Sequence, residues 1–105
     1  MATKASRLDG DSVLGTLSAN KRAIKGFGVR RIGLFGSVAS GKNGRDSDVD
    51  ILVEFSPGKK TFDNYMELKF FLESALGARV DLVVREAVKP AFRKSILEGV
   101  RYAAG

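Results

Sequence analysis

Cysteine, histidine and tryptophan are missing from this 105-residue chain, and proline occurs only twice. Without cysteine no disulfide bond can form, so we expect a reducing compartment, the cytoplasm, rather than secretion. Without histidine, a histidine base, a catalytic triad built on histidine and a histidine-ligated metal are all excluded. Any metal site must use oxygen ligands, which favours magnesium, manganese or calcium over zinc.

Long apolar runs are also missing. No stretch approaches the roughly 20 residues needed to cross a bilayer, and the polar residues 1–12 do not resemble a signal peptide. The composition, 44% hydrophobic and 29% charged, is that of an ordered domain. We therefore expect a single domain over residues 12–105, preceded by a disordered tail over residues 1–11, with no contact to a membrane.

The net charge of +6 indicates either simple solubility or an anionic partner such as a nucleotide, a nucleic acid or an acidic protein. The basic residues are spread from Lys4 to Arg101 rather than gathered in one run. They also lack interleaved surface aromatics. Nucleic acid is therefore not the expected partner.

Apolar periodicity, glycines and turn residues predict alternating helices and strands. The expected order is a helix over 12–25, a strand over 29–35, a short helical turn over 37–41, a strand over 48–55, a helix over 62–76, a strand over 79–84 and a helix over 90–98. This order predicts an α/β (α+β) fold, a small mixed sheet covered by helices. So small a domain leaves little room for a second substrate-binding lobe.

Asp48 and Asp50 stand two positions apart at the head of the second expected strand. Both carboxylates therefore point to one face, with Cα atoms about 6.6–6.8 Å apart. Like charges this close raise one pKa unless a cation lies between them, and a divalent cation accepts such hard oxygen ligands. An ordinary charged turn remains the alternative.

Asp81 is the one acidic residue in the apolar strand over 79–84. A carboxylate there costs free energy unless it is paired, ligated or solvated. It could form a salt bridge with Arg79 or Arg85, or lie at the solvated face of the sheet. It could also be a third metal ligand, and three carboxylates on adjacent strands can hold two magnesium ions for phosphoryl transfer.

Gly36 and Ser37 follow the first apolar strand and precede a short helical turn. Free backbone N–H groups at such a turn can bind phosphate, glycine permits close approach, and the Ser37 hydroxyl can donate to a phosphate oxygen. A plain strand-to-helix turn is the alternative. The pattern is neither a P-loop nor a dinucleotide-binding fingerprint.

The three segments Leu34-Phe-Gly-Ser-Val-Ala-Ser-Gly41, Ser47-Asp-Val-Asp-Ile-Leu-Val53 and Val80-Asp-Leu82 occur in this order. Together they resemble the polymerase-beta-like nucleotidyltransferase superfamily. In detail the chain is similar to its minimal members, the MNT-domain proteins found as antitoxins beside HEPN-domain toxins. The ending Ala91-Phe-Arg-Lys-Ser-Ile-Leu-Glu98 also resembles the final helix of those proteins, and the resemblance covers roughly residues 12–103.

The resemblance implies a nucleotidyltransferase that moves a nucleoside monophosphate, AMP from ATP or one from another NTP, to a hydroxyl on a partner HEPN-type toxin. Asp48 and Asp50 would bind two Mg²⁺ ions, with Mn²⁺ as an alternative. Asp81 would bind the catalytic ion and help to activate the acceptor hydroxyl. Gly36 and Ser37 would hold the triphosphate, and Ser47, which opens the second segment, would belong to the same nucleotide site.

One departure from the family pattern concerns Ser40, where many minimal members carry arginine before the glycine at position 41. Lys42 or Arg45 would then have to supply the basic side chain near the phosphates. This departure keeps a second hypothesis open, in which the chain neutralises its partner by contact and catalyses weakly.

The oligomeric state is left open by the sequence. Four aromatic residues are candidates for a homodimer or partner surface, and a second side of the core is the alternative; they are Tyr65, Phe70, Phe92 and Tyr102.

Overall fold

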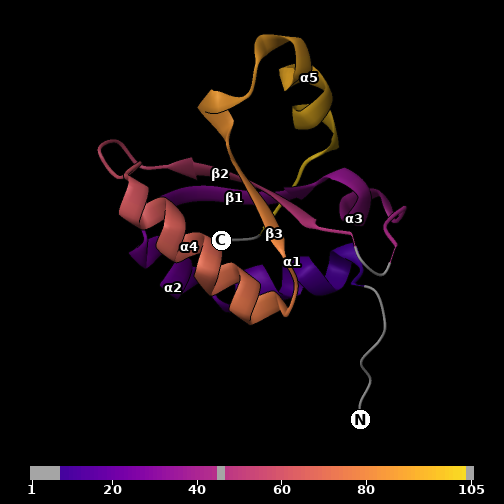
Figure 1. The fold of residues 1–105 in the computed structure, drawn as a ribbon, viewed down its shortest axis with the longest axis horizontal. Coiled ribbons are helices and arrows are strands. Elements are labelled where there is room, and N and C mark those ends of the chain that lie inside the picture. Colours follow the sequence, from indigo (N-terminus) through magenta and orange to yellow (C-terminus); the bar gives the residue numbers. More distant parts are fainter. Residues whose placement is uncertain (1–7, 45–46, 104–105) are drawn as a thin grey trace.

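Four strands form one sheet, with helices on both sides of it (Figure 1). The computed structural model describes residues 8–44 and 47–103. Within them the elements follow in the order α1 (Gly10–Ala19), α2 (Lys21–Gly26), β1 (Val29–Phe35), α3 (Gly36–Ser40), β2 (Val49–Phe55), α4 (Phe62–Leu76), β3 (Val80–Val84), η1 (Arg85–Ala87), α5 (Pro90–Gly99) and β4 (Arg101–Tyr102).

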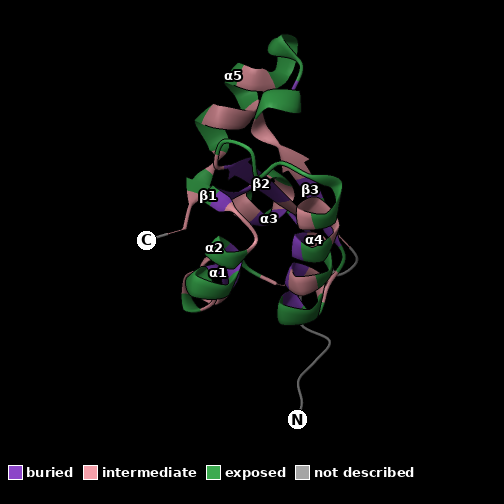
Figure 2. Ribbon diagram, turned by 90° about the vertical axis from the view of Figure 1, so that its left-hand side faces the viewer, coloured by how far each residue is buried: buried purple, intermediate pink, exposed green. Residues whose placement is uncertain are grey.

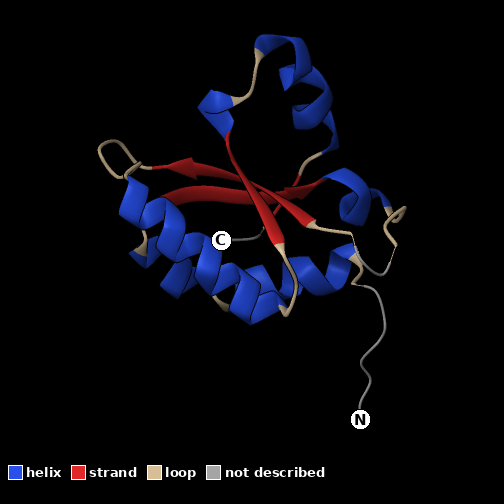
Figure 3. Ribbon diagram, viewed as in Figure 1, coloured by secondary structure: helices blue, strands red, loops and turns tan. Residues whose placement is uncertain are grey.

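The sheet is mixed, with the strand order β3-β2-β1-β4 (Figure 3). Strands β2 and β3 run parallel, whereas β1 is antiparallel to both β2 and β4. A parallel pair needs a crossover connection, and α4 provides it. The predicted small mixed sheet covered by helices is therefore confirmed.

The main core lies between the sheet and the helices α1, α2 and α4. Val49, Ile51 and Val53 of β2 are fully buried there, and Leu17 of α1 and Leu72 of α4 belong to the same cluster. Successive side chains of a strand point to opposite faces, so the even-numbered residues of β2 face the other side of the sheet. That other side carries the predicted carboxylates.

The carboxylate side has a smaller apolar contact. Leu52 of β2 and Val88, which follows η1, are buried but do not belong to the main core. Helix α5 continues on this side, and none of its residues is buried (Figure 2). One face of the sheet is thus fully packed, and the other is only partly covered.

The long helix α4 has the end signals that its sequence predicts. Thr61 caps its start by accepting a hydrogen bond from the Asn64 N–H, and Gly77 ends it in the left-handed conformation with φ 65°. The Glu73 carboxylate accepts the Val80 N–H at 3.0 Å, which attaches the start of β3 to this helix. The cap and this contact together fix where β3 enters the sheet.

The N-terminal helix differs from its prediction in two ways. It begins at Gly10 rather than Ser12, because Asp9 accepts a hydrogen bond from the Ser12 N–H at 2.7 Å and caps it. It also breaks at Asn20, which leaves helical geometry and donates its side-chain amide to the Thr16 carbonyl. The expected tail over 1–11 is too long, and residues 1–7 lie outside the described residues.

Other boundaries differ by one residue each: α3 covers Gly36–Ser40 rather than 37–41, and β3 begins at Val80 rather than 79. β2 begins at Val49, so Asp48 precedes the strand instead of opening it, and α5 extends to Gly99. Among the described helices, none combines the length and the apolar character that a bilayer span requires.

Replacing Leu72 with alanine tests the core on the helix-covered face. Because Leu72 is 1% exposed, Leu72→Ala should lower the free energy of unfolding by about 2–5 kcal/mol in urea denaturation. Phe70→Ala on the same helix is the matched control, since Phe70 is 59% exposed, and should change it by no more than about 0.5 kcal/mol. Equal losses would show that α4 packs through a different face.

Candidate active site

Asp50 and Asp81 lie side by side on the sheet. The parallel register of β2 and β3 pairs Asp50 with Asp81, and both side chains face away from the main core. Asp50 is half-buried and Asp81 is exposed. The strand register therefore brings together two carboxylates that are 31 positions apart in the chain.

Asp48 lies on the same side, one pleat before Asp50, and is paired with Arg79. The Arg79 Nε lies 3.1 Å from the Asp48 Oδ1. The Val49 N–H donates to the Arg79 carbonyl at 2.9 Å, so the parallel pairing extends to these two residues. Arg79 was one expected salt-bridge partner of Asp81, but in the structure it pairs with Asp48.

Burial and neighbouring negative charge both act on Asp50. Burial raises the pKa of this carboxyl above its usual 3.8, and the charges of Asp81 and Asp48 and a hydrogen bond with Asp81 raise it further. The surroundings therefore disfavour the ionised form of Asp50. A bound cation would relieve this cost.

Gly36 allows the chain to pass directly against Asp50. Its φ of +75° is left-handed, and a Cβ atom at Gly36 would lie 2.9 Å from the Asp50 Cγ and 3.1 Å from its Cβ. Any side chain here would displace the carboxylate. The group close to Gly36 is thus the Asp50 carboxylate, and the expected close approach to a phosphate stays a prediction.

Helix α3 begins at Gly36, directly beside this carboxylate. Its N-cap, Phe35, provides no side-chain hydrogen bond to the first turn of α3. Ser37 lies in this first turn and is partly exposed. The predicted phosphate-binding residues thus adjoin the predicted metal ligands.

Lys42 and Arg45 are the residues expected to supply the positive charge that Ser40 lacks. The Ser40 hydroxyl donates back to the Ser37 carbonyl at 3.2 Å and thus stays on its own helix. Lys42 is exposed just beyond α3, and its N–H also bonds to the Ser37 carbonyl. Arg45 lies outside the described residues.

Ser47 closes the loop before β2. Its hydroxyl accepts the Gly44 N–H at 2.9 Å. Asn43, buried in this loop, donates its side-chain amide to the Leu8 carbonyl at 2.8 Å. Ser47 therefore has a loop-stabilising contact, and its predicted contact with a nucleotide stays a prediction.

The chemistry of the donor set fits a hard divalent cation, but the side chains must rearrange to hold it. Within residues 8–44 and 47–103 no three acidic side chains form a ready-made metal site. Asp48 is turned to Arg79 in a solvent-exposed ion pair, a type that contributes only about 0–1 kcal/mol. A cation between Asp48 and Asp50 could displace Arg79 at small cost.

The four aromatic residues proposed as a contact surface separate into two groups. Phe70 and Phe92 are exposed. Tyr65 donates its hydroxyl to the Leu82 carbonyl, and the ring of Tyr102 lies 3.8 Å below the Arg31 guanidinium. The two phenylalanines are thus the more exposed of the four, and the homodimer or partner surface stays a prediction.

Comparison with known proteins gives consistent similarities. The model of the nucleotidyltransferase domain family matches residues 17–103. Protein adenylyltransferase MntA of Thermococcus cleftensis is 44% identical over 87 residues, which cover 82% of this chain and 87% of that protein.

Solved structures agree with this result. A chain provisionally named a minimal nucleotidyltransferase has a TM-score of 0.71 at 37% identity, with 91% of this chain and 97% of that chain covered. A toxin–antitoxin structure with AMP-PNP has a TM-score of 0.66 at 26% identity, with 93% and 74% covered. The resemblance to minimal nucleotidyltransferases seen in the sequence is confirmed.

A pair of glycine substitutions tests the close approach to Asp50. Gly36→Ala and Gly58→Ala both force alanine into a left-handed conformation, with φ of 75° and 79°, but nothing lies within 4 Å of a Cβ at Gly58. Gly58→Ala should cost about 1–2 kcal/mol of stability. Gly36→Ala should cost more in urea denaturation and should also abolish nucleotide transfer, because the Asp50 carboxylate must move. Transfer that survives in Gly36→Ala would contradict this role.

The raised pKa of Asp50 predicts a pH-dependent stability when a chelator removes metal. The folded state binds this proton more tightly than the unfolded state, so its contribution to stability falls as the pH rises from about 3.8 through the folded pKa. Asp50→Asn should therefore be more stable than the wild type at neutral pH, and the difference should disappear as the pH falls. Urea unfolding across this pH range measures the difference in stability. Asp63→Asn, at an exposed position of α4, is the matched loss of one charge. A difference independent of pH would count against charge crowding.

Proposed function

The chain belongs to the nucleotidyltransferase domain family, and from this premise we propose that it transfers AMP from ATP to a hydroxyl of a partner toxin. The observation that supports this most is the meeting of Asp48, Asp50 and Asp81 with the Gly36 turn on one side of the sheet. Family membership makes the chain an enzyme of the nucleotidyltransferase class. The nucleotide, the metal and the acceptor are the proposed parts.

The nucleotide would lie with its phosphates at the start of α3. The N–H groups of its first turn and the Ser37 hydroxyl would donate to phosphate oxygens, and Lys42 would add a positive charge. Ser47 would border the same site from the following loop. Another NTP is the alternative, because these groups contact phosphate rather than base.

Transfer would be an in-line displacement at the α-phosphorus. The acceptor oxygen forms a bond to this phosphorus, the bond to the bridging oxygen of the β-phosphate breaks, and pyrophosphate leaves with that electron pair. Asp81, exposed beside Asp50, would accept the proton of the acceptor hydroxyl. Proton removal and phosphorus attack would then take place on the same face.

Magnesium, or manganese in its place, is the proposed cofactor. Asp48 and Asp50 would hold two ions, and Asp81 would share the catalytic one. The bound ions would neutralise charge on the attacking and leaving oxygens. The raised pKa of Asp50 supports this assignment, because a cation would offset the repulsion that Asp81 and Asp48 add to the effect of burial.

The partner is proposed from the relatives. The Thermococcus relative is named a protein adenylyltransferase, and the 26%-identical neighbour is named a toxin–antitoxin structure with AMP-PNP. We propose that this chain is likewise the antitoxin of a pair, that its partner is a HEPN-type toxin, and that it acts in the cytoplasm. The domain's small size is consistent with an acceptor that another protein presents.

Neutralisation by contact alone is the second candidate. Two observations favour it: Ser40 supplies no positive charge above α3, and Asp48 is paired with Arg79. Under this function the partner would be inhibited without being modified.

The test is label transfer to the product of the neighbouring gene with magnesium and labelled ATP. The wild type should label this protein, and Asp48→Asn with Asp50→Asn should lower the rate by roughly a hundredfold or more, because charge stabilisation at phosphorus is lost. Asp63→Asn with Glu67→Gln, which also neutralises two exposed carboxylates but on α4, should label normally. A double aspartate variant that still binds and inhibits the partner would favour the contact function, and an unlabelled partner with the wild type would refute transfer.

A further inference from the structure

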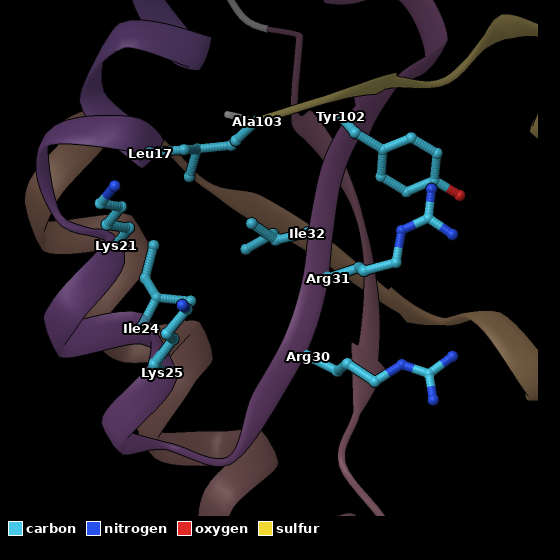
Figure 4. A pocket seen from close by; sticks show the side chains of 9 residues that line it. All are labelled: Leu17, Lys21, Ile24, Lys25, Arg30, Arg31, Ile32, Tyr102 and Ala103. Atoms are coloured by element: carbon cyan, nitrogen blue, oxygen red, sulfur yellow. The ribbon is translucent and has the colours of Figure 1, made fainter. Parts of the chain in front are cut away.

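A cavity of about 200 Å³ lies on the opposite side of the sheet from the aspartates, between β1 and the helices α1 and α2 (Figure 4). Its apolar lining includes Leu17, Ile24 and Ile32, and Ala103 borders it after β4. Drug-sized ligands and nucleotides occupy pockets of about 300–1,000 Å³. This cavity therefore suits one or two apolar side chains rather than a nucleotide.

The cavity lies along an open part of the sheet edge. β4 pairs only with Gly33 and Leu34 of β1, and the Ala103 N–H adds one hydrogen bond to the Ile32 carbonyl. In the described part of the chain no strand continues this pairing beside residues 29–31 of β1. An edge of this kind offers backbone donors and acceptors to an added strand.

Lysines border the cavity on the helix side. Lys21 and Lys25 are four positions apart on α2, so they share a face, and both are exposed. Neither takes part in an ion pair within the described residues. These two positive charges are therefore available to an anionic partner.

The arginines of β1 are occupied elsewhere. Figure 4 shows Arg30 and Arg31 pointing away from α2, on the other side of the strand. Both are paired with Glu54, at 3.4 and 3.6 Å, and Arg31 also lies over the Tyr102 ring. The cavity thus combines an apolar floor, an open strand edge and a rim of two free lysines.

We propose that this edge groove, formed by β1, α1 and α2, binds an extended segment of a partner protein in which apolar and acidic residues alternate. The segment adds as a strand beside residues 29–31, places an apolar side chain against Ile24 and Ile32, and directs a carboxylate to Lys21 or Lys25. A second copy of this chain is disfavoured as occupant, because it brings the same lysines and a net charge of +6.

The groove leaves the aspartate side free. Ile32 belongs to the main core, whereas Asp50 and Asp81 face away from it. A partner held at the groove does not cover the site of transfer. The groove therefore acts as an anchor that is separate from the catalytic residues.

The test uses a labelled short peptide of alternating glutamate and leucine, with a peptide that carries lysine for glutamate as its match. Fluorescence anisotropy should show saturable binding of the glutamate peptide alone. Lys21→Glu with Lys25→Glu should weaken it by about tenfold, because the attraction between the peptide carboxylate and either lysine becomes repulsion. Lys89→Glu with Lys94→Glu, an equal charge change on α5, should weaken it by no more than about twofold.

A second variant tests the cavity without changing charge. Ala103→Phe should fill the space beside Ile32 and abolish peptide binding in a variant that circular dichroism shows to be folded. The proposal is overturned if the lysine peptide binds as tightly as the glutamate peptide. It is also overturned if Ala103→Phe and the Lys21/Lys25 variant both bind the glutamate peptide like the wild type, or if the glutamate peptide does not bind at millimolar concentration. A dimer in sedimentation that Ala103→Phe dissociates would make a second copy the occupant and would also overturn it.

Discussion

The parallel register of β2 and β3 places Asp50 directly beside Asp81, and the other features of the site depend on this contact. Burial raises the pKa of Asp50, and the repulsion from Asp81 and Asp48 raises it further. The packed core on the opposite face holds the strands in this register despite the repulsion. The sheet thus maintains a concentration of negative charge that a divalent cation can relieve.

Two residues beside the aspartates, Gly36 and Arg79, limit which groups can bind there. Gly36 passes so close to Asp50 that a Cβ atom would displace the carboxylate, and the start of α3 therefore lies next to it. Arg79 is paired with Asp48 at the solvent-exposed end of the cluster. Under the proposed function, a cation would replace this weak ion pair with ligation, and phosphate would bind at the adjoining start of α3.

Much of this could be predicted from the sequence, because alternating apolar residues and glycines specify the strands and their ends. The place of Asp81 in an apolar strand marked it as unusual but left open a third ligand, a salt bridge with Arg79 or Arg85, or a solvated position. The partner of Arg79 could not be predicted, because it depends on the register of two strands separated by α4. The break at Asn20 is local, since its side chain bonds to the Thr16 carbonyl four residues earlier, but the apolar periodicity alone did not show it. Where the pairing of β4 with β1 stops among the described residues is a tertiary detail that leaves no local pattern.

The central claim is that the three aspartates and the Gly36 turn form one site for metal and nucleotide. A melting scan with magnesium and a non-hydrolysable ATP analogue tests it most directly. At a ligand concentration about a hundredfold above Kd, the folded state should gain about 2.7 kcal/mol, and the melting temperature should rise in the wild type. The rise should require magnesium and nucleotide together and should disappear in Asp50→Asn. An unchanged melting temperature at millimolar ligand, or an equal rise in Asp50→Asn, would contradict the account.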